Sequence, residues 1–165
     1  MTTRMKMTTA IVPAVFCLAV LTAGLHAQCT PGAMAVIVNK SNGTESLSPG
    51  QLRKLLIGDV RVWPDHKPVA LISREASSNV AQCAVTTIVR LSPAEFRRYV
   101  MNAEFRGDDP LAIQNADSDA QAGKLVSAAG GGLAIVDSSS LPSLGTSVKV
   151  LKINGKSPGE PGYPL

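Results

Sequence analysis

Aromatic residues are scarce in this sequence. Phe, Trp and Tyr together make up 4% of the 165 residues, which argues against stacking platforms for single-stranded nucleic acid. The net charge is only +4 and no run of Lys and Arg is present, so the sequence lacks the basic patch typical of nucleic-acid-binding proteins. Nucleic acid is therefore not an expected partner.

The residues needed for catalysis are also few. Beyond residue 27 the single histidine is His66, which lies in a proline-flanked turn next to Asp65. Two such residues are too few for a dedicated metal site. A Ser-His-Asp triad assembled in space remains the alternative. The sequence predicts a protein that is not an enzyme and that carries no metal or cofactor.

No apolar run in the sequence matches the length of a membrane span. The main one, residues 10–25, is shorter than the roughly 20 apolar residues that a span needs. Arg4 and Lys6 precede this run and Ala27 follows it, which is the three-part layout of a secretory signal. The sequence therefore predicts a signal peptide over residues 1–27 and a periplasmic or secreted protein, with no membrane span after its removal. An uncleaved N-terminal anchor is the alternative.

Two cysteines remain beyond the predicted signal, Cys29 and Cys83. In an oxidising compartment an isolated pair is more often a disulfide than two free thiols. The alternative is that Cys83 serves as a small buried apolar residue. We predict the disulfide, which would close a loop of about 55 residues.

The rest of the chain alternates between strand and helix signals. Short apolar runs predict buried strands, at residues 33–38, 69–72, 133–136 and 148–151. Serines in capping patterns predict where helices begin, at Ser48, Ser77 or Ser78, Ser92 and Ser118. This order predicts an α/β fold with a mixed sheet of about four to five strands flanked by helices, in one domain over residues 28–155.

Two further expectations concern the helix after Ser92 and the end of the chain. Phe96, Val100 and Phe105 are spaced to face inward from that helix. Residues 156–165 contain three prolines and two glycines, so we expect a disordered tail there.

One segment combines groups that favour an anion. Residues 72–80 leave a strand at Arg74, pass Ser77 and Ser78, and enter a helix. Open N–H groups at a helix N-terminus attract an anion, Arg74 offers a charge-assisted fork, and a serine offers a hydroxyl. The alternative is that the serine only caps the helix and that Arg74 is an ordinary surface charge.

Five features of the chain follow one another in a recognisable order. They are a short helix that ends at a glycine, a tryptophan turn, a strand followed by arginine and serine, a Phe-x-Gly segment and a glycine-led strand. They lie at residues 48–58, 62–65, 71–78, 105–107 and 131–136. In this order, residues 47–137 resemble one lobe of the phosphate-type solute-binding proteins of ABC transporters, which have the type II periplasmic-binding-protein fold.

The resemblance implies a non-catalytic protein that binds phosphate or a similar oxyanion, with a transporter or envelope protein as a partner. The ligand-binding residues it implies are Arg74, Ser77, Ser78 and Asn79. The family has glycine and threonine where this chain has Asn79 and Val80, and glycine where it has His66. The typical member also clamps its ligand between two lobes, whereas this chain has the length of one. An interaction or scaffold module that has lost ligand binding is therefore the alternative.

Overall fold

The computed structural model describes residues 29–105 and 113–165. The predicted signal peptide, residues 1–27, lies outside the described residues, and so does most of the Phe-x-Gly segment. No helix in the described ranges is long and apolar enough to cross a membrane.

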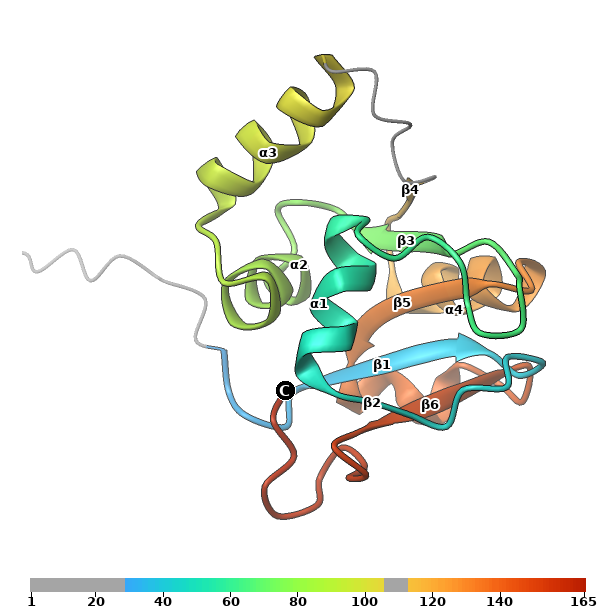
Figure 1. The fold of residues 1–165 in the computed structure, drawn as a ribbon. Helices are drawn as coiled ribbons and strands as arrows, with labels where there is room; N and C mark the ends of the chain where they lie inside the picture. The colour runs from blue at the N-terminus through green and yellow to red at the C-terminus, as the bar shows by residue number, and fades with distance from the viewer. Residues whose placement is uncertain (1–28, 106–112) are drawn as a thin grey trace, which may run out of the picture.

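A six-stranded mixed sheet forms the centre of the fold (Figure 1). Its strands are β1 (Met34–Asn39), β2 (Ser46–Leu47), β3 (Ala70–Arg74), β4 (Ile113–Ala116), β5 (Gly132–Asp137) and β6 (Val148–Ile153). They lie in the order β2-β6-β1-β5-β3-β4. β1 pairs antiparallel with β5 and β6, whereas β3 pairs parallel with β5 and β4. The predicted α/β class is confirmed, and the sheet is slightly larger than expected.

The two strands that the sequence did not predict lie at the edges of the sheet. β2 has only two residues and pairs with β6. In β4 three of the four residues are exposed, so its largely polar sequence lacks the apolar pattern of a buried strand. β1 is the opposite case, because all six of its residues are buried between layers of helices on both faces.

Helices cover both faces of the sheet. They are α1 (Pro49–Ile57), α2 (Asn79–Cys83), the π-helix η1 (Ala84–Val89) that continues α2, α3 (Pro93–Phe105), α4 (Asp119–Ala128) and the 3-10 helix η2 (Ser138–Ser143). α1, α2 and η1 contribute to the larger apolar core on one face, and α4 and η2 pack against the other face. At four helix starts a predicted serine accepts a hydrogen bond from the backbone N–H three residues on; these are Ser48, Ser78, Ser92 and Ser118.

The turn between α1 and β3 contacts the start of β5. The indole N–H of Trp63 donates to the carbonyl of Gly131 at 2.9 Å. A side chain on Gly131 would clash with the carbonyl oxygen of Pro68, so close packing requires glycine there. In the same turn His66 has a φ of 64°, the left-handed conformation that favours glycine. The residue that departs from the resembled family is thus held in a backbone conformation suited to that family's glycine.

α3 differs from the prediction. Its Phe105 is 85% exposed, although helical spacing placed it on an inward face with Phe96 and Val100. Phe96 packs against the larger core, and the hydroxyl of Tyr99 donates to the carbonyl of Ile57 at 2.9 Å. The second half of α3 projects away from the sheet (Figure 1). The inward prediction for Phe105 is wrong because only the first half of the helix reaches the core.

The last ten residues also differ from the predicted disordered tail. Tyr163 and Leu165 are buried in the larger core, and the carbonyl of Leu165 accepts a hydrogen bond from the N–H of Gly32. Backbone hydrogen bonds across 157–160 and 160–163 close two turns before them. The glycines and prolines of this segment therefore serve as turn residues that return two apolar side chains to the core.

Candidate functional site

Three parallel strands end at the same edge of the sheet. β3 ends at Arg74, β4 at Ala116 and β5 at Asp137, and α2, α4 and η2 begin just beyond them. Ligands in open α/β sheets prefer this carboxyl edge. The predicted anion-binding segment therefore lies where this fold favours a site.

The guanidinium of Arg74 is bound within the protein. It forms an ion pair with the carboxylate of Asp119 and donates to the carbonyls of Ala116 at 3.3 Å and Asp117 at 2.9 Å. The side chains of Arg74 and Asp119 are only 15% and 12% exposed. Arg74 is therefore a partly buried, paired group, which corrects the alternative expectation of an ordinary surface charge.

Asp119 receives donors of the kind that an oxyanion would need. Besides Arg74, its carboxylate accepts hydrogen bonds from the backbone N–H of Asp137 at 3.2 Å and from the hydroxyl of Ser140 at 2.7 Å. A guanidinium, a backbone N–H at a helix start and a hydroxyl thus converge on a carboxylate that the chain itself supplies. These charge-assisted bonds satisfy the donors with an internal anion.

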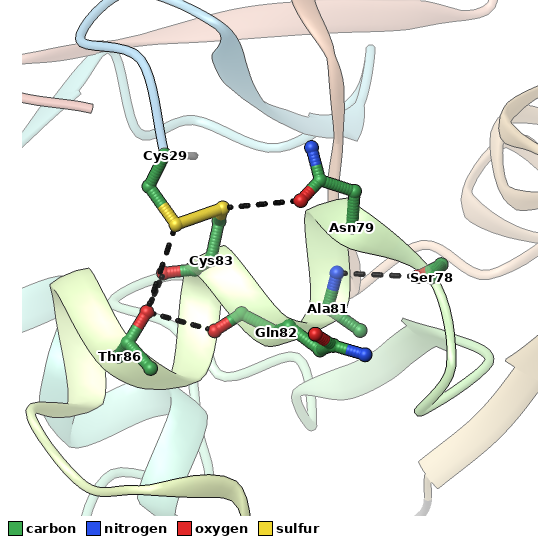
Figure 2. Close-up of a disulfide and its surroundings, with 7 residues drawn as sticks. All are labelled: Cys29, Ser78, Asn79, Ala81, Gln82, Cys83 and Thr86. Atoms are coloured by element: carbon green, nitrogen blue, oxygen red, sulfur yellow. Dashed lines mark hydrogen bonds between the residues drawn. A yellow bond between two sulfur atoms is a disulfide. The ribbon is translucent and has the colours of Figure 1, made fainter. Parts of the chain in front are cut away.

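Ser77 and Ser78 lie at the start of α2. The hydroxyl of Ser78 accepts from the N–H of Ala81 at 3.2 Å, as a helix cap (Figure 2). Ser77 is exposed, and its carbonyl accepts from the side chain of Gln82 at 3.2 Å. Among the described residues no hydrogen bond joins either serine to the guanidinium of Arg74. In the described residues Arg74, Ser77 and Ser78 thus each bond to a different partner.

The predicted disulfide joins Cys29 to Cys83, with Cα atoms 5.4 Å apart (Figure 2). Cys83 is buried and Cys29 is exposed, so the bond ties the N-terminal segment to α2. The Oδ1 of Asn79 lies 3.6 Å from the sulfur of Cys83. The hydroxyl oxygen of Thr86 lies 3.8 Å from the sulfur of Cys29. Asn79, the fourth predicted ligand residue, therefore faces the disulfide and not Arg74.

A cavity of about 140 Å³ lies on the α1 side of the sheet, beside the end of β3. Most of its walls are apolar residues of β3, α2, η1 and the start of α3, and its polar wall residues are Ser73, Arg74, Gln82 and Arg97. Sequence reasoning did not find this cavity. Its wall residues have the same apolar spacing as core residues, so no local signal separates a cavity wall from a filled core.

The described residues contain no group of three or more His, Cys, Asp or Glu side chains that could hold a metal ion. His66 is exposed, and its neighbour Asp65 pairs with Lys67 at 2.9 Å. The hydrogen bond from Lys67 lowers the pKa of the Asp65 carboxyl, so this carboxylate is held in its charged form as a surface ion pair.

Residues 155–159 read Gly-Lys-Ser-Pro-Gly and match the G-x-S-x-G pattern of a nucleophile elbow, which needs a sharp strand-to-helix turn. They follow β6 as a turn, and no helix comes after them in the described part of the chain. Ser157 donates its backbone N–H to the carboxylate of Glu160 at 2.7 Å. The serine of this motif therefore lacks the setting that makes such a serine reactive.

No protein-family model matches the chain. Its fold is similar to that of a protein assigned as a phosphate ABC transporter substrate-binding protein, with bound phosphate, from Clostridium perfringens; the identity is 19%, the TM-score 0.58, and the match covers 78% of this chain and 49% of that chain. An ABC-type phosphate transport receptor from Vibrio cholerae is 20% identical, with a TM-score of 0.52 over 78% of this chain and 50% of that chain. PstS from Borrelia burgdorferi is 15% identical, with a TM-score of 0.61 over 76% of this chain and 49% of that chain.

The chain spans about half the length of these solved proteins. Identities this low establish a likeness of fold, and that likeness agrees with the fold that the sequence resemblance implied. The mixed sheet, its flanking helices and the half-length match together show that the chain has the fold of one lobe of the phosphate-type solute-binding proteins.

Proposed function

We propose that this protein is an exported, non-catalytic binding module that keeps one lobe of the solute-binding fold and does not hold free phosphate. A periplasmic or secreted location is supported by the predicted signal peptide and by the disulfide, because disulfides persist in oxidising compartments. The non-catalytic role is supported by the similar solved proteins, which are a substrate-binding protein and a transport receptor.

The pair of Arg74 and Asp119 is the observation that carries the proposal. A phosphate at Arg74 would have to displace a carboxylate that also accepts from Asp137 and Ser140. Leaving a fully buried charge without its partner costs about 3–5 kcal/mol, and for this partly buried pair phosphate would first have to offset part of that cost. If Asp119 stayed in place, its negative charge would repel the phosphate. Both routes lower the affinity for phosphate.

A phosphate-like oxyanion ligand is the second candidate. One of the similar solved proteins holds bound phosphate. Arg74 ends β3 and the other three predicted ligand residues follow it, at the carboxyl edge where ligands bind in such folds. If the protein binds such an oxyanion, a transporter subunit or another envelope protein would complete the cleft that one lobe leaves open.

A titration with phosphate separates the two candidates. The melting temperature of the purified protein is measured by scanning calorimetry with and without millimolar phosphate or sulfate, and we expect no change. A bound oxyanion at a hundredfold excess over Kd would stabilise the fold by about 2.7 kcal/mol. Such stabilisation, weakened in a Ser78→Ala variant, would refute the proposal.

Asp119→Asn tests the physical reason behind the proposal. The amide keeps an oxygen acceptor for Ser140 and leaves Arg74 without a counter-charge, so phosphate should stabilise this variant although it does not stabilise the wild type. Asp65→Asn changes an exposed aspartate that pairs with Lys67 and serves as the matched control. If Asp119→Asn also fails to respond, Asp119 is not what prevents phosphate from binding.

A further inference from the structure

The cavity beside the end of β3 has the size and lining of a site for an apolar group. It is a partly open pocket of about 140 Å³, close in volume to an apolar protein cavity of about 150 Å³ that holds benzene. Its walls include Leu56 of α1, Leu71 of β3, Val89 of η1 and Phe96 of α3. Ligand sites in proteins are mostly apolar with a few placed polar groups, so the polar wall residues decide what else a ligand must carry.

Arg97 is the polar wall residue that has no partner among the described residues. Ser73 donates its hydroxyl to the carbonyl of Arg74 at 3.0 Å, and Gln82 donates to a backbone carbonyl at 3.2 Å. Arg74 is paired with Asp119. No Asp or Glu is among the residues that line the cavity. Within the part of the chain that the structure describes, the exposed Arg97 therefore stands at an apolar cavity without a counter-charge in its walls.

We infer that this cavity binds a small apolar carboxylate, with its aliphatic or aromatic body against the walls and its carboxylate at Arg97. The nearest acid in the sequence, Glu95, accepts from the N–H of Ser92 at 2.8 Å and does not line the cavity. Phosphate fits poorly, because burying a multiply charged oxyanion against apolar walls is costly without several donors. The inference rests on the proposed binding-module function and names the class of its ligand.

The probe is 4-methylpentanoate, which joins a branched apolar body to one carboxylate. During titration of the purified protein, backbone amide shifts measured by NMR should change and saturate around the cavity, for example at Ile72, Ala84 and Val89. 4-Methylpentan-1-ol has the body without the charge, and acetate has the charge without the body. We expect the alcohol to bind roughly tenfold more weakly than the acid and acetate to leave these shifts unchanged.

Two pairs of variants locate the two halves of the ligand. Arg97→Met should weaken binding of the acid roughly tenfold and leave the alcohol unaffected, whereas Arg98→Met, on the same helix but outside the cavity wall, should change neither. Ala81→Leu places a larger side chain in the cavity and should abolish binding of both. Ala120→Leu on the exposed surface of α4 is its control. Far-UV circular dichroism checks that each variant folds.

The inference would be overturned if the acid caused no saturable shift at tens of millimolar, a concentration that saturates a site with a Kd of about 1 mM. Equal affinity for the acid and the alcohol would overturn it too, and so would an Arg97→Met variant that binds the acid as tightly as the wild type. Tighter binding of acetyl-Gly-Gly-Leu than of the free acid would also overturn it. This peptide ends in a branched apolar side chain and a carboxylate, so the preferred ligand would then be a polypeptide C-terminus and not a small acid. Stabilisation by phosphate that persists in Arg97→Met would refute the proposed function, whereas the response to the acid and its loss in Arg97→Met test the cavity separately. The two failures are therefore distinguishable.

Discussion

Removal of the disulfide between Cys29 and Cys83 tests how firmly the N-terminal segment is held. The two cysteines are 54 residues apart in the sequence, and the closed loop contains β1, α1 and β3. In the chain-entropy model a loop of this length stabilises the fold by about 4 kcal/mol. Cys29→Ala opens the loop and leaves Cys83 as a small buried apolar residue, so the loss reports mainly on the crosslink.

Urea unfolding followed by circular dichroism measures this loss. We expect the free energy of unfolding to fall by about 4 kcal/mol and the melting temperature by about 8–16 °C. Reductant should lower the wild type to the stability of Cys29→Ala and leave that variant unchanged. Thr86→Ala removes a hydroxyl that lies 3.8 Å from the Cys29 sulfur without opening the bond, and it should cost no more than about 1 kcal/mol.

Equal stability of Cys29→Ala and the wild type would refute this reasoning about the crosslink. Two reactive thiols in oxidised, denatured wild type would refute the pairing itself. A loss well below 4 kcal/mol without free thiols would mean that the unfolded chain keeps residual structure that already restricts the loop.

Three other substitutions test features described above. Arg74→Ala should cost about 3 kcal/mol in urea unfolding, because it leaves the Asp119 carboxylate, which is 12% exposed, without its cation; a loss under about 1 kcal/mol would show that the pair contributes little. Burial raises the pKa of the Tyr163 phenol to about 12. Since the unfolded phenol ionises near 10.0, the stability from this group is complete below that pH and is lost as the pH rises towards 12. Tyr163→Phe should lack this alkaline loss, and an identical pH profile for both proteins would contradict the assignment. His66→Val should cost about 1–2 kcal/mol because a β-branched residue is strained at a φ of 64°, whereas His66→Gly should not destabilise; calorimetry that finds equal melting temperatures for the two would count against this strain.

Features set by near neighbours in the chain could be predicted from the sequence. Ser48 and Gln51 form both hydrogen bonds of a capping box, and Asn42 accepts from the N–H of Thr44 in a turn. Each of these interactions joins residues two or three positions apart. The apolar run of β1 likewise predicted a buried strand, because burial on both faces favours apolar residues along the strand. Its polar last residue, Asn39, is buried with its side-chain amide donating to the carbonyls of Val126 and Ser127.

Features set by distant partners could not be predicted. The segment around Arg74 was predicted to lie between a strand and a helix, as it does. Its partner Asp119 lies 45 residues away, and the parallel pairing of β3 with β4 brings the two together. Phe105 has the spacing of a buried residue, but burial also needs a surface to pack against. The cavity is likewise a property of how six elements meet, namely α1, β3, α2, η1, α3 and β5, which spacing within one element does not encode.

The position of β1 has a consequence for the order in which the protein folds. Val36 of β1 lies opposite Ile135 of β5 and Leu151 of β6. Both partners follow roughly a hundred residues later, and closing so long a loop is entropically costly and slow. During synthesis this strand, apolar except for Asn39, therefore emerges early and stays unpaired until the chain has grown to β5 and β6. Until then the sheet lacks its central pairings, and the nascent chain exposes apolar surface that is prone to aggregate.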